Sequence, residues 1–181
     1  MPLRPVLLLG AVVLILPSPA QGQAEPIVPT TLKAGLLARF AESSSKVLQL
    51  GEAIPAAKFS WRPAPGVRSI SEVLVHVGLG NYYTTSDAGA KPTLQIGDEL
   101  EKTITNKTEV LAFLRTSIDH VRSALERLTE ADLEHPTTMF GQSTNYENVY
   151  LFGIAHVHEH LGQLITYARL NDVVPPWTHA H

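Results

Sequence analysis

The protein has 181 residues, enough for one domain with a sizeable core and too few for two comfortable ones. Its formal net charge of −3 at pH 7, without a basic run, gives no support for nucleic acid or an anionic membrane as partner. The chain contains no cysteine, so the fold does not rely on disulfides and no thiol of its own can act as nucleophile or metal ligand.

Residues 1–24 have the layout of a secretory signal peptide. Arg4 precedes the apolar run VLLLGAVVLIL, and a stretch of small residues follows. This order is typical of a cleavable export signal, here with a cut after Gly22 or Ala24. The run is too short to span a bilayer easily. We expect a secreted or periplasmic protein with no integral membrane span in its mature form; an uncleaved N-terminal anchor is the alternative.

The first predicted helix covers about residues 31–50. Leu36, Phe40 and Val47 fall on one stripe at helical spacing. A connector with three prolines follows, AIPAAKFSWRPAPGVRS, and its prolines exclude a regular helix. We expect Trp61 to be the hydrophobic anchor of this connector.

The second predicted helix starts at the capping box SISE. Ser69 caps the free amides and Glu72 reaches back to the cap. An alternative for Glu72 is a role as partner or proton acceptor of His76, one turn further on. The helix continues to about Gly89, and the sequence predicts a loop over residues 90–105.

The third predicted helix starts at Asn106, with Glu109 three residues on. Its apolar side chains recur every three or four residues, as in a helix of a bundle. They are Leu111, Leu114, Ile118, Val121, Leu125 and Leu128.

The fourth predicted helix starts at the capping box TNYE, Thr144 to Glu147, and runs to about Asn171. Pro175 and Pro176 prevent its continuation. The preceding stretch EHPTTMFGQS is predicted as a loop, and no segment shows a convincing strand alternation.

Together these elements predict an all-α, up-down-type four-helix bundle over residues 30–178. Residues 25–29 are a short linker after the signal segment, and residues 179–181 are a tail.

The fourth helix carries three histidines within five residues. At about 100° per residue, His156 and His160 lie one turn apart on the face that should enter the core, and His158 points away. Buried imidazoles cost desolvation unless they are bonded or ligated. One divalent ion satisfies both rings, since i, i+4 spacing brings both within its reach. Other members of this face are Val149, Gly153, Gln163, Tyr167 and Leu170.

A third ligand should come from another helix, and His76 is the best candidate because it lies at the edge of an apolar arc of the second helix. Gly80 and Gly153 remove side chains one turn from the ligands, which would leave room for an ion, water or substrate. Three protein ligands and an open position are typical of reactive rather than structural metal sites. The metalloprotease motif H-E-x-x-H is absent, because Gly162 stands where its second histidine is needed. We assign no role to the other histidines.

The C-terminal sequence HVHEHLGQLITYARLNDVVPPWT resembles the ending of the DinB-like family, in particular its YfiT-type members. The resemblance covers about residues 30–178. It implies a four-helix bundle with a divalent metal site made by His76, His156 and His160, for which zinc and nickel are the usual occupants. The other residues that carry the resemblance are Trp61, Pro63, Ser69, Glu72, Gly162, Gln163, Arg169, Leu170, Asn171, Pro175, Pro176 and Trp177.

Four functional hypotheses follow. The first is a metal-dependent hydrolase acting on an ester, amide or similar small-molecule electrophile. The second, implied by the resemblance, is a thiol-dependent transferase, which an export signal makes less expected. The third is a non-catalytic binding module stabilised by the metal. The fourth has no metal, with the histidines hydrogen-bonded to Tyr83, Tyr167 or Gln163. A homodimer is compatible with all four.

Overall fold

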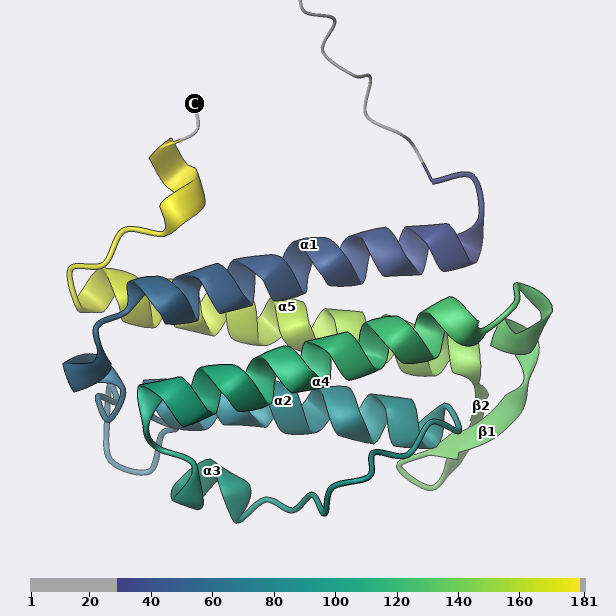
Figure 1. Ribbon diagram of the computed structural model, residues 1–181, viewed down its shortest axis with the longest axis horizontal. Coiled ribbons are helices and arrows are strands. Elements are labelled where there is room, and N and C mark those ends of the chain that lie inside the picture. Colours follow the sequence, from purple (N-terminus) through teal and green to yellow (C-terminus); the bar gives the residue numbers. More distant parts are fainter. Residues whose placement is uncertain (1–28, 180–181) are drawn as a thin grey trace, which may run out of the picture.

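Four long helices pack side by side in this computed structural model, which describes residues 29–179 (Figure 1). The all-α four-helix bundle predicted from the sequence is confirmed. Shorter elements join the long helices. The α-helices are α1 (Leu32–Ala53), α2 (Ile70–Asp87), α3 (Leu100–Thr103), α4 (Lys107–Arg127) and α5 (Tyr146–Leu170), and the 3-10 helices are η1 (Ala56–Lys58), η2 (Ala131–Glu134) and η3 (Pro176–His179).

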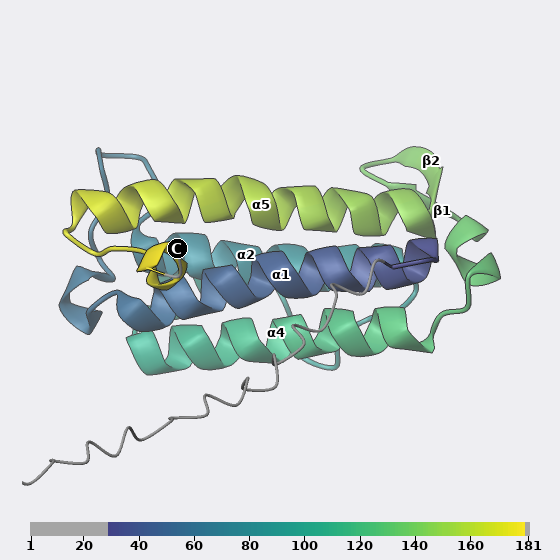
Figure 2. The ribbon, with the colours of Figure 1, turned by 90° about the horizontal axis from the view of Figure 1, so that it is seen from above.

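The order of the helices around the bundle differs from their order in the chain. Both α1 and α2 lie beside α4 and α5, so α1 and α2 occupy opposite corners (Figure 2). The connection over residues 88–106 returns along the bundle, and α2 and α4 therefore run in the same direction (Figure 1). The strict alternation of an up-down arrangement, expected from the sequence, is not kept at this step, because the long connection spans the length of the bundle. This return also brings the short helix α3, inside the stretch predicted as a loop, against α2.

The core of the bundle is apolar along its whole length. Every long helix contributes fully buried side chains, among them Leu50 of α1, Leu74 of α2, Leu114 of α4 and Leu164 of α5. At about 25 cal/mol per Å² of apolar surface removed from water, such burial dominates the stability of the fold. The bundle therefore has a continuous packed apolar interior.

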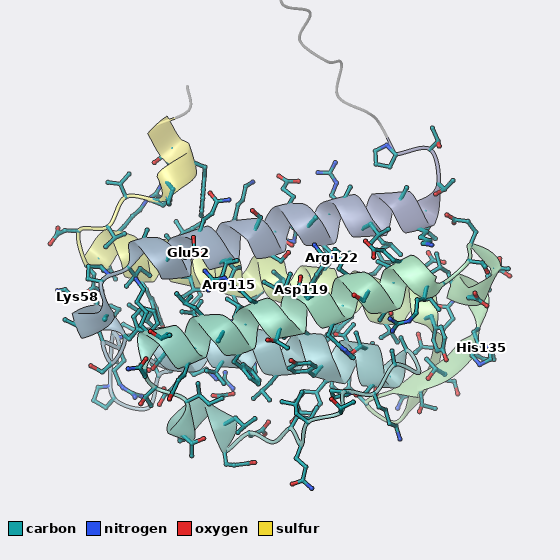
Figure 3. All side chains as sticks on the ribbon, viewed as in Figure 1. Glu52, Lys58, Arg115, Asp119, Arg122 and His135 are labelled. Atoms are coloured by element: carbon teal, nitrogen blue, oxygen red, sulfur yellow. The ribbon has the colours of Figure 1, made fainter. Side chains whose placement is uncertain are left out.

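The outer face of α4 is charged where it meets solvent. Arg115 pairs with Glu52 of α1, and Arg122 donates to Asp119 at 2.9 Å (Figure 3). These side chains are about half exposed, so their pairs contribute little to stability.

Two helix starts follow the sequence prediction and one does not. At α2 the amide of Ser69 donates to Glu72 Oε2 at 2.7 Å and the amide of Glu72 donates to Ser69 Oγ at 3.3 Å, which confirms the capping box. Asn106 caps α4, as predicted. The predicted cap of the last helix at Thr144 is wrong: Asn145 accepts from the amide of Asn148 at 3.0 Å, because Thr144 belongs to a strand.

A β-hairpin occupies the stretch that was predicted as a loop. Strands β1 (Pro136–Met139) and β2 (Gln142–Asn145) are antiparallel. Phe140 and Gly141 form the two-residue turn with φ of 51° and 75°. Positive φ at both positions is the type I′ geometry that matches strand twist. The prediction failed because the strands are largely polar and the turn lacks the usual Asn-Gly or Asp-Gly.

The predicted signal segment, residues 1–24, lies outside the described residues, as does the end of the tail. Within residues 29–179, no helix combines the length and the apolarity that crossing a membrane requires.

Candidate metal centre

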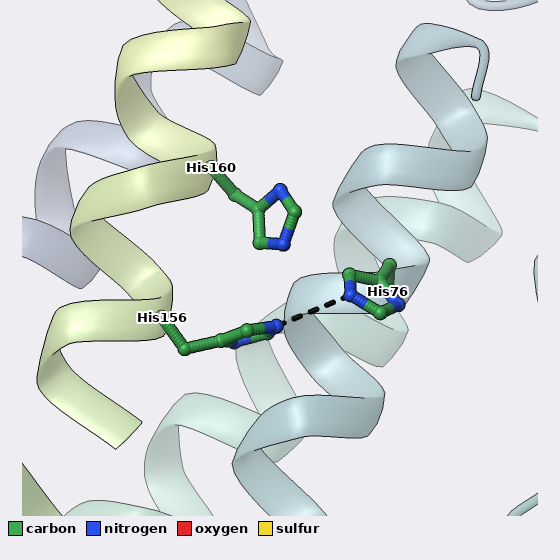
Figure 4. A group of neighbouring side chains, drawn as sticks. All are labelled: His76, His156 and His160. Atoms are coloured by element: carbon green, nitrogen blue, oxygen red, sulfur yellow. Dashed lines mark hydrogen bonds between the residues drawn. The ribbon is translucent and has the colours of Figure 1, made fainter. Parts of the chain in front are cut away.

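Three imidazoles from two helices meet inside the bundle (Figure 4). His76 comes from α2, and His156 and His160 come from α5, one turn apart. One ring nitrogen of each lies within 4.8 Å of the other two. The Nε2 atoms of His76 and His156 are 3.2 Å apart. All three histidines predicted from the sequence are therefore brought together.

The spacing of these nitrogens fits a single ion. In a tetrahedral site with metal–nitrogen bonds of about 2.0–2.1 Å, two ligating nitrogens lie about 3.3 Å apart. The separation of 3.2 Å between His76 and His156 is close to this value. His160 extends from the next turn of α5 toward the same point, as Figure 4 shows.

The protonation states of the rings also suit a cation. Burial lowers the pKa of His76. Burial, together with the neighbouring imidazoles His160 and His76, lowers the pKa of His156 to about 4. Both rings are therefore neutral at pH 7, and a neutral imidazole is the form that binds metals. His160 is 8% exposed, the most buried of the three.

Glu101 of α3 orients His76, a contact that the sequence analysis missed. His76 Nδ1 donates to Glu101 Oε1 at 2.8 Å, and Arg68 donates to both carboxylate oxygens, at 2.7 and 3.1 Å. Burial would raise the pKa of Glu101, but the hydrogen bonds from Arg68 and His76 outweigh it and lower that pKa. Glu101 is thus a carboxylate that holds the proton of His76 on Nδ1 and leaves Nε2 as the acceptor that faces His156 Nε2.

Glu72 does not contact His76, so that alternative is not supported. Its carboxylate accepts from Lys102 at 2.7 Å and from Arg62 at 3.0 Å, in addition to the cap of α2. Burial would raise the pKa of Glu72, but these hydrogen bonds hold it at about 2. Glu72 therefore ties α3 and the connector to the start of α2.

Gln163 plays the corresponding part for His160. His160 Nδ1 donates to Gln163 Oε1 at 2.8 Å, and Gln163 Nε2 donates to the Tyr167 hydroxyl at 2.8 Å. The hydrogen bonds expected for a network without metal are therefore partly present, and they also leave Nε2 of His160 available. Tyr83 was expected in that network, but its hydroxyl donates to Asp98 at 3.2 Å.

The two glycines near the rings have a different role from the one expected. A Cβ at Gly80 would lie 2.3 Å from Cε1 of His156, and a Cβ at Gly153 would lie 2.8 Å from the side chain of Thr84. Gly80 therefore makes room for the imidazole itself, and Gly153 allows α2 and α5 to approach closely. The space they release is filled by His156 and Thr84.

Two further positions of α5 can be compared with the predicted helical face. His158 is exposed, as expected, and its Nδ1 donates to the carbonyl of Ile154 at 3.0 Å. Leu170 was placed on the buried face, but it is 61% exposed because α5 ends there and the chain turns away.

A pocket of about 540 Å³ opens beside the histidine cluster. His76 and His156 lie on its wall, whereas His160 does not line it. A small molecule in this pocket would therefore contact two of the three rings. The remaining lining residues come from α2, the 88–106 connection, the hairpin and α5: Gly80, Tyr83, Thr84, Asp87, Asp98, Met139, Phe140 and Phe152.

The fold and the cluster together define a helix-bundle protein with three histidines that can hold a metal ion. Residues 39–164 match the family described as the DinB superfamily, and the chain belongs to that superfamily. The family resemblance seen in the sequence is thereby confirmed. None of the curated proteins compared with the chain matches it.

Two solved structures share this fold. A DinB-like protein from Bacillus cereus ATCC 10987 has a TM-score of 0.71 and 20% sequence identity, over 78% of this chain and 94% of that chain. The DinB-like protein YjoA from Bacillus subtilis has a TM-score of 0.62 and 19% identity, over 76% of this chain and 92% of that chain. At such identities the likeness concerns the fold alone.

Proposed function

We propose that His76, His156 and His160 hold one divalent metal ion, zinc or nickel, and that the protein uses it to hydrolyse a small-molecule substrate. The observation that carries this proposal is the convergence of three ring nitrogens within 4.8 Å. Glu101 and Gln163 hold the Nδ1 protons of two of the rings and so turn their Nε2 atoms inward.

When bound by three imidazoles with an open position, such an ion supplies Lewis acidity and lowers the pKa of a bound water to about 7. The residues of the chain position the substrate and exclude water. Because His76 and His156 line the pocket, a substrate there lies against the cluster. The apolar and aromatic wall of the pocket excludes water from one side of that substrate.

The proposal includes export, which depends on the predicted signal segment. Small reducing thiols are scarce outside the cytoplasm. We therefore favour hydrolysis over the thiol-dependent transfer that the family resemblance implies. The chain has no cysteine, and a thiol reaction would need its thiol from a co-substrate.

Metal content tests the site directly. Untagged protein, purified without a metal column, is expected to contain about one zinc or nickel per chain by mass spectrometry. His160→Ala should abolish this content because a ligand is lost. His158→Ala is the matched control, since His158 is exposed on the same helix and should retain the metal. Equal metal content in both variants would exclude the site.

Chelation separates a reactive ion from a structural one. The continuous core of the four helices predicts that metal-free protein keeps its helical circular dichroism at 25 °C. Unfolding on chelation would instead support the binding-module hypothesis, in which the ion joins α2 to α5.

A further inference from the structure

The turn of the hairpin places a large aromatic residue in a strained conformation. Phe140 has φ of 51° and is 76% exposed. A bulky residue at positive φ is uncommon and destabilising, whereas Asn at this position of a type I′ turn has little cost. Since Phe140 buries little of its own surface, core packing does not explain why phenylalanine stands there.

Phe140 lies on the wall of the pocket beside the histidines. Its ring meets Phe152 edge-on, with centroids 5.2 Å apart, and Phe152 is stacked on His156 at 6.3 Å. A row of three rings thus leads from the hairpin tip to the histidine cluster.

The hairpin is attached to α2 at the edge of the same pocket. Thr137 Oγ1 donates to the carbonyl of Asp87 at 2.7 Å, and Met139 packs against the core. These contacts hold Phe140 over the pocket rather than leaving it on a free loop.

The charged side chains of the pocket wall are acidic. Asp87 and Asp98 line it, and no lysine or arginine among the described residues does. Asp98 is exposed and accepts from Tyr83, a third aromatic residue of the wall. The carboxylate of Asp87 accepts no hydrogen bond from the side chains or amides of residues 29–179, and burial raises its pKa.

We infer that the pocket binds small molecules carrying a protonated amine or a quaternary ammonium group, with the cation against the aromatic wall formed by Phe140, Phe152 and Tyr83 and facing Asp98. Aromatic faces attract organic cations within about 6 Å of the ring centroid, and nearby carboxylates add a favourable field. An anionic substrate would instead meet two carboxylates. The inference that the substrate is cationic rests on the proposed function. The inference that the pocket binds cationic molecules does not depend on that function.

Choline and its neutral isostere 3,3-dimethylbutan-1-ol provide the probe pair. The two have the same shape and the same hydroxyl group, so a difference in affinity reports the charge. We expect choline to bind about tenfold more tightly by isothermal titration calorimetry at low salt, with benzoate weaker than either. Equal affinities, or tighter binding of benzoate, would overturn the inference.

Substitution at Phe140 separates binding from folding. Phe140→Asn removes the ring and supplies the residue that the turn prefers, so the melting temperature should stay the same or rise while choline binds about three- to tenfold more weakly. Unchanged choline affinity in this variant would contradict the role given to Phe140.

Substitution at Asp98 tests the charge on an exposed residue whose change does not threaten the fold. Asp98→Asn should weaken choline about three- to tenfold and leave the neutral isostere unaffected. Glu99→Gln is the matched control, because it makes the same change of charge one residue away and Glu99 does not line the pocket. An equal loss in both variants would indicate a general charge effect and refute the site.

Each titration is made on protein of measured metal content and repeated after chelation. Choline binding in the metal-free protein supports the pocket even where the metal proposal fails. Full metal content without a preference for choline refutes the pocket and leaves the metal proposal standing.

Discussion

The hydrogen bond from His76 to Glu101 gives a quantitative prediction for metal affinity. Glu101→Gln keeps an oxygen that can accept from His76 Nδ1 but removes the negative charge. A hydrogen bond to a charged group contributes about 1.5–3 kcal/mol and one between neutral groups about 0.5–1.5. The difference of about 1–1.5 kcal/mol corresponds to roughly tenfold in affinity.

Screening by solvent should reduce this effect little, because Glu101 is only 6% exposed. Arg68 and His76 share the Glu101 carboxylate, so the variant also leaves the Arg68 guanidinium near His76 without its anionic partner, which works against a cation in the site. Glu101→Gln should therefore bind zinc about 10-fold more weakly, and Glu101→Ala about 100-fold, within the range found when such outer carboxylates are removed.

The assay is competition with a chromophoric chelator at pH 7.5, where His76 is neutral in both proteins. Glu99→Gln serves as the control for the loss of one negative charge, since Glu99 is exposed and lies two residues from Glu101. A Glu101→Gln affinity within twofold of the unsubstituted protein would refute the orienting role. The melting temperature of each variant shows whether the change is confined to the site.

Two further predictions concern the packing and protonation of His156. Gly80→Ala should weaken zinc binding at least tenfold and destabilise the fold by about 1–3 kcal/mol, because its Cβ would lie 2.3 Å from the His156 ring. The control is Gly162→Ala, whose Cβ would meet no atom within 4 Å and which should be neutral or stabilising in thermal melts. In metal-free protein, the lowering of the His156 pKa from 6.5 to about 4 makes the folded state less able to take up a proton. The contribution of the neutral His156 ring to the free energy of unfolding is therefore complete above pH 6.5 and is lost as the pH falls toward 4. The loss is at most about 3 kcal/mol, and about 1–2 kcal/mol after solvent screening. Urea titrations from pH 4 to 7 should show this slope, and His156→Gln should flatten it; an unchanged slope would contradict the assignment.

Helical periodicity was sufficient to find two of the three histidines, and the family resemblance supported the third, His76. On α5, His156 and His160 follow the 3.6-residue repeat, and His158 is excluded by the same geometry. His76 was a candidate because it lies at the edge of an apolar arc on the second helix. The face of a helix on which a residue lies follows from its spacing along that helix, and packing of the helices does not change it.

The hydrogen-bond partners of the histidines differ in the same way: one is near in the sequence and the other is distant. Gln163 is three residues from His160 on the same helix, so sequence spacing could indicate it. Glu101 is 25 residues from His76 and reaches it only because the 88–106 connection runs back along α2. No periodicity within that stretch predicts such a return.

The hairpin was missed for a similar physical reason. Its strands carry threonine, serine and asparagine rather than alternating apolar residues, and its turn is Phe-Gly. The contacts that hold it join residues far apart in the sequence, such as the hydrogen bond from Thr137 to the carbonyl of Asp87.

The returning connection between α2 and α4 places the carboxylate partner of His76 on a different element from the histidines. The long helices α2 and α5 position the imidazoles, whereas the carboxylate that accepts from His76 lies on the four-residue helix α3. Arg68 binds this carboxylate, and Lys102 joins α3 to Glu72. Changes in this surface segment can therefore alter the carboxylate beside His76 while the apolar interior of the bundle stays the same.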